Sequence, residues 1–266
     1  MIDRLARVLI LLPPSETKTP PAAGDSLHLE SLELQELTPT RERLLRALVT
    51  VCQGNRARAM KRLGLGHTQT EAVERNARLH DEPTARADEV YTGVLYAAWD
   101  PATLSTDARK RADESVAVTS ALFGLVRPGD HIPAYRLSST VTLPRLGTVS
   151  GVWRPRLGPA LERLVGDGLM LDLRSGSYVN LHRPIGDLAS RTATIRVLHE
   201  RSAHGERGTR TVVSHFNKAT KGRMVRGLLE NDVRPSNVGE LCVALGDLGW
   251  TVERDGNRLD VVVSAL

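Results

Sequence analysis

The sequence predicts a mixed α/β fold: a single domain with a mixed β-sheet and a helical lobe that carries a helix-hairpin-helix-like element. Short apolar runs that end at turn residues alternate irregularly with helical stretches, which favours a mixed sheet over a doubly wound one. Hydrophobic residues make up 41% and charged residues 25% of the chain, as is usual for a protein that buries a core. We expect this domain over residues 8–266, with the helical hairpin at about 40–80 and an N-terminal extension at 1–7.

The first predicted strand is Val8–Leu12, five consecutive apolar residues that end at two prolines. A continuous apolar run of this length is typical of a strand buried on both faces. Further strands are expected over Val116–Thr119, Leu169–Leu173, Thr194–Leu198 and Arg210–Ser214, and a closing hairpin over Trp250–Arg254 and Arg258–Val262. Asp255-Gly256-Asn257 supplies the turn of that hairpin.

The first predicted helix begins near Thr38 or Thr40 with Pro39 in its first turn. Its apolar residues recur at helical spacing: Leu44, Leu45, Leu48 and Val49. Further helices are expected over Asn55–Arg62, Thr70–His80, Ser105–Arg111, Arg156–Val165, Thr220–Glu230 and Asn237–Leu248.

A glycine-rich turn, Gly64-Leu65-Gly66, separates two of these helices. In a helix-hairpin-helix, such a turn presents backbone N–H groups to a phosphate, and neighbouring cationic and hydroxyl side chains assist. The predicted DNA contacts are Gly64, Gly66, His67 and Thr68, with Lys61, Arg62 and Thr70 nearby. The alternative is an ordinary helix connection with a glycine at the helix end, and the pattern alone favours neither.

Four polar clusters end or follow apolar runs, and strand ends of one sheet face the same side. We therefore expect them to converge on one site for a phosphate-bearing or carboxylate-bearing ligand. The predicted ligand-binding residues are Ser15, Glu16, Lys18, Arg127, Tyr135, Arg136, Arg174, Lys218, Lys221 and Arg223. The candidate catalytic residues, as groups that move protons, are Asp130, Asp172 and Tyr178. The alternative is that Arg127 with Asp130, and Asp172 with Arg174, are structural ion pairs.

The charge balance favours a polyanionic partner: the net charge is +5, carried mostly by arginine. Aromatic residues are only 3%, which argues against a protein that stacks successive bases of a single strand. The histidines and the two cysteines lack metal-ligand spacing, so no metal and no cofactor are expected. The cysteine usage fits a reducing cytoplasm, and Val8–Leu12 is too short to span a membrane.

The order of these segments resembles the YaaA family of peroxide-stress proteins. The most specific match is Ser120-Ala-Leu-Phe-Gly-Leu-Val-Arg-Pro-Gly-Asp130 followed by Tyr135-Arg-Leu137. The other matching segments are Val8 to Lys18, Val90-Tyr-Thr-Gly93, Leu171 to Tyr178 and Phe216 to Met224, and together they cover 8 to about 231. The chain departs from the family at Ser177, where an acidic residue is often found, and in its short closing hairpin.

The resemblance implies a DNA-binding helix-hairpin-helix, a positively charged cleft and a role in limiting oxidative damage to DNA. Two hypotheses follow. In the first, the protein binds DNA backbone without sequence preference; in the second, it is an enzyme acting on a nucleotide, nucleobase or other anionic small molecule in the same cleft. A monomer without membrane contact is expected in both cases.

Overall fold

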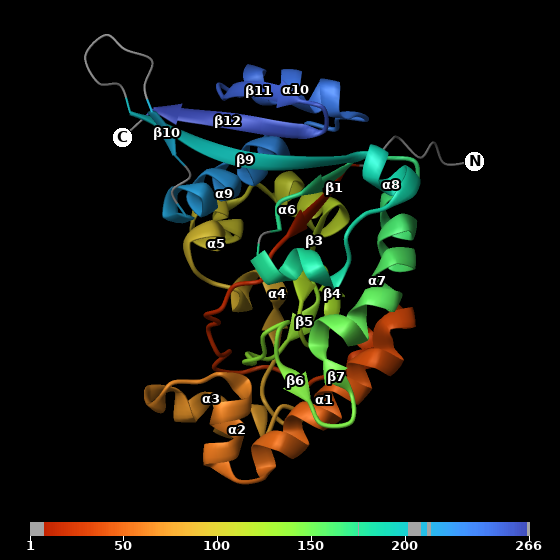
Figure 1. The fold of residues 1–266 in the computed structure, drawn as a ribbon, viewed down its shortest axis with the longest axis vertical. Coiled ribbons are helices and arrows are strands. Elements are labelled where there is room, and N and C mark those ends of the chain that lie inside the picture. Colours follow the sequence, from red (N-terminus) through yellow and green to blue (C-terminus); the bar gives the residue numbers. More distant parts are fainter. Residues whose placement is uncertain (1–7, 175, 202–208, 212–213, 265–266) are drawn as a thin grey trace.

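The computed structural model describes residues 8–174, 176–201, 209–211 and 214–264, so the expected extension at 1–7 lies outside the described residues. Its centre is an eight-stranded sheet in the order β11-β12-β9-β8-β1-β3-β4, with β10 paired to β9 (Figure 1). The strands are β1 (Leu9–Leu12), β3 (Val116–Ser120), β4 (Gly124–Val126), β8 (Met170–Asp172), β9 (Thr192–Arg201), β10 (Thr209–Thr211), β11 (Thr251–Asp255) and β12 (Arg258–Ser264).

The sheet is mixed, which confirms the predicted fold class. Strands β3, β1, β8, β9 and β12 are parallel, whereas β4, β10 and β11 each run antiparallel to their neighbours. Strand β1 lies in the middle, where Ile10 is level with Val116 of β3 and Leu171 of β8, and all four of its residues are buried. An apolar run covered on both faces is what the sequence predicts for this segment.

Ten α-helices surround the sheet among the described residues. They are α1 (Thr38–Gln53), α2 (Arg56–Leu63), α3 (Thr70–Asn76), α4 (Ala87–Val90), α5 (Val94–Trp99), α6 (Thr106–Ser115), α7 (Val149–Val165), α8 (Gly186–Ser190), α9 (Ser214–Glu230) and α10 (Val238–Asp247). Helices α5, α6 and α9 lie together on one side of the sheet and α7 lies on the other (Figure 1). Helices α1 to α3 form a lobe beyond the carboxyl ends of the central strands (Figure 1).

Short elements complete the fold. Two small sheets pair β2 (Ala85–Arg86) with β5 (His131–Ile132) and β6 (Thr142–Leu143) with β7 (Gly147–Thr148). The 3-10 helices are Leu29–Ser31, Gln35–Leu37, His67–Gln69, Pro101–Thr103 and Gly176–Leu181.

Two helices begin earlier than the sequence predicts. Helix α7 starts at Val149 and contains Pro155 and Pro159, which in the sequence argue against a helix before Arg156. The Thr148 side chain caps its start by accepting from the Gly151 N–H, 3.2 Å away. Helix α9 starts at Ser214, so the strand expected over Arg210–Ser214 ends, in β10, at Thr211.

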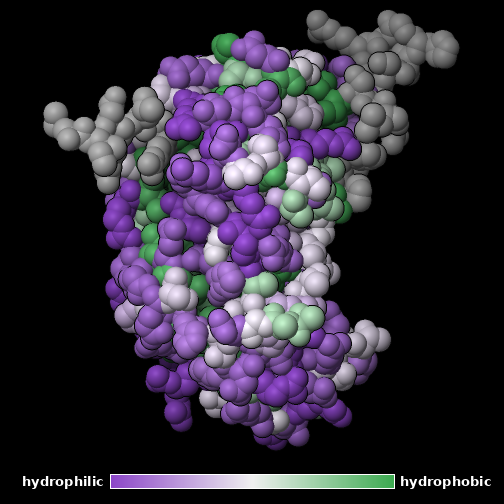
Figure 2. Space-filling view, turned by 180° about the vertical axis from the view of Figure 1, so that it is seen from behind, coloured by the Kyte–Doolittle hydropathy of each residue, from purple (hydrophilic) through white to green (hydrophobic). Residues whose placement is uncertain are grey.

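Figure 2 shows one face of the molecule, on which hydrophilic residues predominate and apolar residues lie in small separate areas. Only Ile185 and Val243 are large hydrophobic residues that stay exposed among the residues described. None of the described helices combines the length and apolar character needed to cross a membrane.

Candidate functional site

The site is built on the loop that follows β1. Residues 90–96 hold this loop in place: the Ser15 hydroxyl accepts a hydrogen bond from the Thr92 N–H at 3.0 Å, and the Tyr96 hydroxyl donates to the Pro13 carbonyl at 2.8 Å. The backbone of Lys18 forms a β-bridge with Tyr91. These tethers fix the position of Lys18 at the carboxyl end of the central strand, where α/β proteins build their sites.

The Lys18 amine lies against two aromatic rings. Its Nζ is 4.3 Å from the ring centroid of Tyr135 and 5.2 Å from that of Tyr91, and it donates to the Ser15 carbonyl at 2.9 Å. The ring faces stabilise the ammonium form. Burial, first, and the positive charge of Arg136, second, destabilise it, with Glu16 opposing them, so the pKa of Lys18 is lowered to about 7. The amine therefore loses its proton much nearer to neutral pH than an ordinary lysine does.

A chain of hydroxyl groups lies beneath the lysine. The Tyr91 and Tyr135 hydroxyl oxygens are 3.0 Å apart, and the Tyr135 hydroxyl is 2.8 Å from the hydroxyl of Ser120, which accepts from the Phe123 N–H at 2.9 Å. Burial raises the pKa of both tyrosines well above the ordinary value. These hydroxyls therefore stay protonated, and they bond to one another and to Ser120.

All four tyrosines of the chain gather around this point. The Tyr96 ring stacks on Tyr91 with centroids 5.5 Å apart. Tyr178, on the 3-10 helix Gly176–Leu181, is half-buried, and burial together with the nearby Tyr135 raises its pKa. Tyr91, Tyr96 and Tyr135 are buried in the core, so the cluster forms a rigid aromatic support under the Lys18 amine.

A groove opens beside the lysine. Its volume is about 740 Å³, and it is lined by Glu16, Arg58, Lys61, Arg62, Leu63, Gly64, Arg136, Ser138, Thr140, Val141 and Thr142. Four of these side chains are cationic and one, Glu16, is a carboxylate. The Arg136 guanidinium donates to the Glu16 carbonyl at 2.8 Å and pairs with its carboxylate at 3.3 Å. The groove therefore joins the loop after β1 to the helical hairpin.

The glycine turn lies at one side of the groove. Gly64 adopts a left-handed conformation at φ +66, and the N–H groups of Gly64 and Leu65 donate back to Lys61 and Met60. The Gly66 N–H donates to the Gln69 side chain. The N–H groups of His67 and Thr68 have no acceptor within the described part of the chain. The turn thus ends α2 and leaves two donors for an external acceptor.

A second cluster lies at the end of β8. Arg174 donates to both carboxylate oxygens of Asp172, at 2.8 and 2.9 Å, and to the carbonyls of Tyr178 and His182. It thereby holds the segment that carries Tyr178. The Lys221 amine donates to the Leu173 carbonyl at 3.1 Å, and burial lowers the pKa of Lys221 to about 8.

Helix α9 holds the other cations predicted in this region. Lys221 is only 5% exposed, whereas Lys218 and Arg223 are exposed on the helix surface. Asn217, one turn before Lys221, has a buried Oδ1 atom without a hydrogen-bond partner in the structure. The three cations predicted here as ligand-binding residues are therefore divided between a buried amine and two exposed side chains.

Arg127 and Asp130 lie near the other end of β3. The Arg127 guanidinium donates to the carbonyl of Val116, the first residue of that strand. The Asp130 carboxylate accepts from the N–H groups of Glu33 and Arg127, and burial raises its pKa. Arg41 lies beside them, fully buried, and donates to the carbonyls of Glu33, Phe123 and Leu125. These residues connect the loop before α1 to β4.

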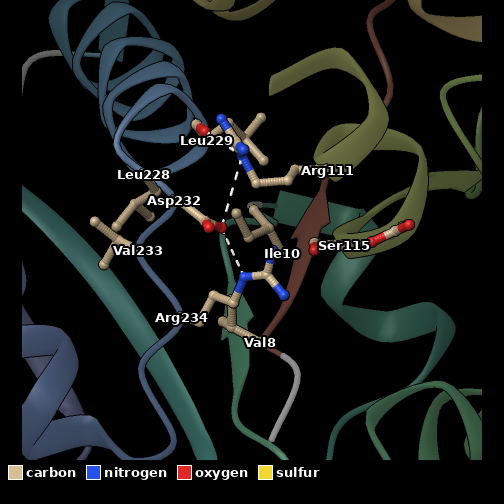
Figure 3. Close-up of a pocket in the computed structure, with 10 residues that line it drawn as sticks. Val8, Ile10, Arg111, Ser115, Leu228, Leu229, Asp232, Val233 and Arg234 are labelled. Carbon is tan, nitrogen blue, oxygen red and sulfur yellow. Dashed lines mark hydrogen bonds and ion pairs between the residues drawn. The ribbon is translucent and has the colours of Figure 1, made fainter. Parts of the chain in front are cut away.

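The amino end of β1 is closed. The cavity there has a volume of about 20 Å³ and is lined by Ile10 of β1 and by Val8, which precedes the strand, among others (Figure 3). Asp232 fills its rim between Arg111 and Arg234, with ion pairs of 3.7 and 2.6 Å (Figure 3). Such a volume holds a water molecule at most. Ligand-sized space at the ends of β1 is therefore at its carboxyl end.

Several residues at the site carry no clear signal in the sequence. Tyr91, Tyr96, Ser120 and Arg58 stand in ordinary contexts, although Tyr91 and Ser120 belong to the segments that carry the family resemblance. No group of three or more His, Cys, Asp or Glu side chains that could hold a metal ion occurs in the described ranges.

Replacing Lys18 with methionine tests its lowered pKa. Between pH 7 and the ordinary 10.5, the unfolded wild type binds a proton that the folded state does not, so wild-type stability rises with pH over this window. Relative to Lys18→Met, the free energy of unfolding of the wild type should rise by about 1 to 3 kcal/mol from pH 6 to pH 10. This is less than the full pKa shift would give, because solvent screens the half-buried side chain. Urea titrations at several pH values measure this difference. For the exposed Lys110→Met, the difference in free energy of unfolding from the wild type should not change with pH. The same result for Lys18→Met would contradict a lowered pKa of Lys18.

Fold and site together define an α/β protein with a lysine–tyrosine site at the carboxyl ends of its central parallel strands and a cationic groove beside it. The chain belongs to the family described as peroxide stress protein YaaA, whose family model matches residues 8–253.

Its relatives are similar over nearly the whole chain. A UPF0246 protein of Streptomyces coelicolor is 46% identical over 263 residues, covering 96% of this chain and 98% of the relative. A UPF0246 protein of Corynebacterium efficiens is 39% identical with the same coverage, and one of Bacteroides thetaiotaomicron is 27% identical over 87% of this chain and 83% of the relative. The family resemblance seen in the sequence is thereby confirmed.

Proposed function

We propose that this peroxide-stress family member binds DNA and limits its oxidative damage, holding the phosphate backbone in the groove between the helical hairpin and Arg136. The observation that carries this proposal is the lining of the groove, where Arg58, Lys61, Arg62 and Arg136 face a single carboxylate. Because Glu16 pairs with Arg136, the three cations of α2 that line the groove remain to neutralise phosphates. Arginine and lysine contacts of this kind read no base, so binding is independent of sequence.

The hairpin adds neutral donors to these charges. The N–H groups of His67 and Thr68 start the short 3-10 helix that follows the glycine turn. Backbone N–H groups at a turn approach a phosphate oxygen more closely than long side chains do. They complement α2, whose last turn carries Lys61 and Arg62.

Removing the three α2 cations that line the groove tests the proposal. In the variant Arg58→Ala/Lys61→Ala/Arg62→Ala, the slope of log Kd against log salt for a random-sequence duplex should fall by about 2 to 3, because each phosphate contact contributes roughly 0.9. Fluorescence anisotropy over a salt series measures this slope. The matched control is Arg43→Ala/Lys110→Ala/Arg156→Ala, three exposed cations outside the groove. Equal slopes for both triple variants would rule out the groove as the DNA site.

The lysine–tyrosine cluster favours a second function, an enzyme acting on an anionic small molecule. A backbone-binding surface has no use for a lysine of lowered pKa held against two buried tyrosines. In this case Arg136 binds the anionic group of the ligand, beside Lys18.

A thermal-shift screen with nucleotides and sugar phosphates tests this second function. A ligand at about 100 times its Kd stabilises by about 2.7 kcal/mol and should raise the Tm by roughly 5 to 10 °C, and the rise should vanish in Arg136→Ala. Arg156→Ala, a surface cation outside the groove, should keep the rise. A rise that persists in Arg136→Ala places the ligand elsewhere.

A further inference from the structure

Two of the described lysines have a clearly lowered pKa, and they differ in access. Lys221 is 5% exposed and its amine is bound to the Leu173 carbonyl under α9. Lys18 is half-buried, and it stands two residues after Glu16, which lines the groove. Lys18 therefore adjoins Glu16 and Arg136 of the groove, whose charges act on its amine, whereas Lys221 is enclosed by protein.

We propose that Lys18 is a nucleophile that forms an imine with the aldehyde carbon of a phosphate-bearing sugar held in the groove. This inference rests on the proposed function, because the groove cations are what would bind the phosphate. It adds to that function the chemical class of the reacting group. A charged ammonium has no lone pair to attack with, so the lowered pKa of Lys18 provides the reactive form at neutral pH.

The surroundings of Lys18 match the needs of this reaction. Arg136 lies both on the groove and close enough to Lys18 to act on its charge, so phosphate contact and nucleophile are adjacent. The rings of Tyr91 and Tyr135 form an apolar wall against the amine, which excludes water from that side. Their hydroxyls bond to each other and to Ser120, which holds both rings in place against the amine.

The chemistry balances without an oxidant, a reductant or a metal. The lone pair of Nζ forms a bond to the aldehyde carbon, and the carbonyl π electrons move to the oxygen; a proton then passes from Nζ to that oxygen to give a carbinolamine, and Nζ also releases the second proton that leaves in the water. Loss of that hydroxyl as water, with a second proton, leaves a C=N bond between Lys18 and the sugar. Hydrolysis reverses the step and returns the free amine.

An open-chain sugar aldehyde flanked by phosphate has two sources. One is an abasic site in DNA, where the deoxyribose has lost its base; the other is free 2-deoxyribose 5-phosphate. Both present the same aldehyde and phosphate chemistry, and the groove cations distinguish them, because only DNA has neighbouring phosphates to occupy Arg58, Lys61 and Arg62.

Borohydride trapping tests the inference, since borohydride reduces an imine to a stable secondary amine. The full chain is incubated at pH 7.5 with a duplex containing one abasic site, with the same duplex intact, or with free 2-deoxyribose 5-phosphate, and sodium cyanoborohydride is added. Covalent adducts are measured on denaturing gels and located by peptide mass spectrometry. The variants are Lys18→Arg, which keeps the positive charge, and Lys110→Arg, an exposed lysine outside the site. Circular dichroism confirms that each is folded.

The expected result is an adduct on Lys18 with abasic duplex, reduced at least tenfold in Lys18→Arg and unchanged in Lys110→Arg. If an adduct forms on Lys18 with the free sugar phosphate but not with the abasic duplex, Lys18 is still the nucleophile and its substrate is the free sugar phosphate. Intact-duplex affinity is measured in parallel and decides the groove proposal separately. If the wild type binds duplex but forms an adduct with neither aldehyde, the inference about Lys18 is wrong, and the proposal that the groove binds DNA is unaffected. Equal trapping in Lys18→Arg, or adducts spread over surface lysines, also overturns it.

Discussion

Replacing Gly222 with alanine is expected to destabilise the protein by about 2 to 3 kcal/mol, although alanine favours helices. Gly222 lies in α9 where that helix crosses α5. A Cβ atom at this position would stand 2.2 Å from the Leu95 carbonyl oxygen and 2.8 Å from the Trp99 nitrogen. Both are backbone atoms that cannot rotate away, so the two helices would have to separate.

Gly227, five residues further along the same helix, is the matched control. A Cβ atom there would meet only the Leu248 side chain at 3.5 Å, an ordinary contact. Gly227→Ala should therefore be neutral or stabilise the protein by about 0.5 to 1 kcal/mol. Urea unfolding followed by circular dichroism measures both variants, and equal stabilities would show that the close helix contact is not rigid.

The close contact at Gly222 also bears on the site. Its neighbour Lys221 reaches the Leu173 carbonyl at the end of β8 from the same turn of α9. Gly222→Ala should move this amine as α9 shifts. Gly222, which allows α9 to lie close to α5, is thus next to the buried Lys221. The sequence Lys221-Gly222-Arg223 by itself does not show which of these side chains faces the sheet.

The strands were predictable because burial on both faces requires apolar runs, and Val8–Leu12 is such a run. The helix α7 was harder, because Pro155 and Pro159 argue against a helix that Trp153, Leu157 and Leu161 hold by burial. Tertiary packing outweighs local preference there.

For the site residues too, some positions follow from local sequence patterns and others depend on the whole fold. Lys18 and Tyr135 follow apolar runs and do meet at one sheet edge, 4.3 Å apart. Arg127 also follows such a run, but β4 reverses direction relative to β3, so Arg127 is carried to the start of β3. Tyr91 reaches the site through a β-bridge to Lys18, which lies 73 positions earlier in the sequence. Strand direction and long-range pairing are set by the whole fold, and no local pattern encodes them.

Replacing Arg174 with methionine should have the largest effect on stability, a loss of about 3 to 5 kcal/mol. The Arg174 side chain has 0% exposure and the Asp172 side chain 6%, so the variant leaves a carboxylate in the interior without its guanidinium partner. It also leaves the carbonyls of Tyr178 and His182 without that donor. The segment that carries Tyr178 should therefore loosen, with faster amide hydrogen exchange over residues 176–182.

The double variant Asp172→Asn/Arg174→Met separates these two causes. If the unpaired Asp172 carboxylate causes most of the lost stability, neutralising it should recover about 1 to 2 kcal/mol, because a neutral amide is far easier to bury than an unpaired charge. If the double variant is no more stable than Arg174→Met, the lost bonds to Tyr178 and His182 dominate instead. Arg183→Met, an exposed arginine of the same segment, is the control and should stay within about 0.5 kcal/mol of the wild type. Recovery of stability without recovery of exchange protection at 176–182 would assign Arg174 two roles: neutralising Asp172, and holding Tyr178 at the site.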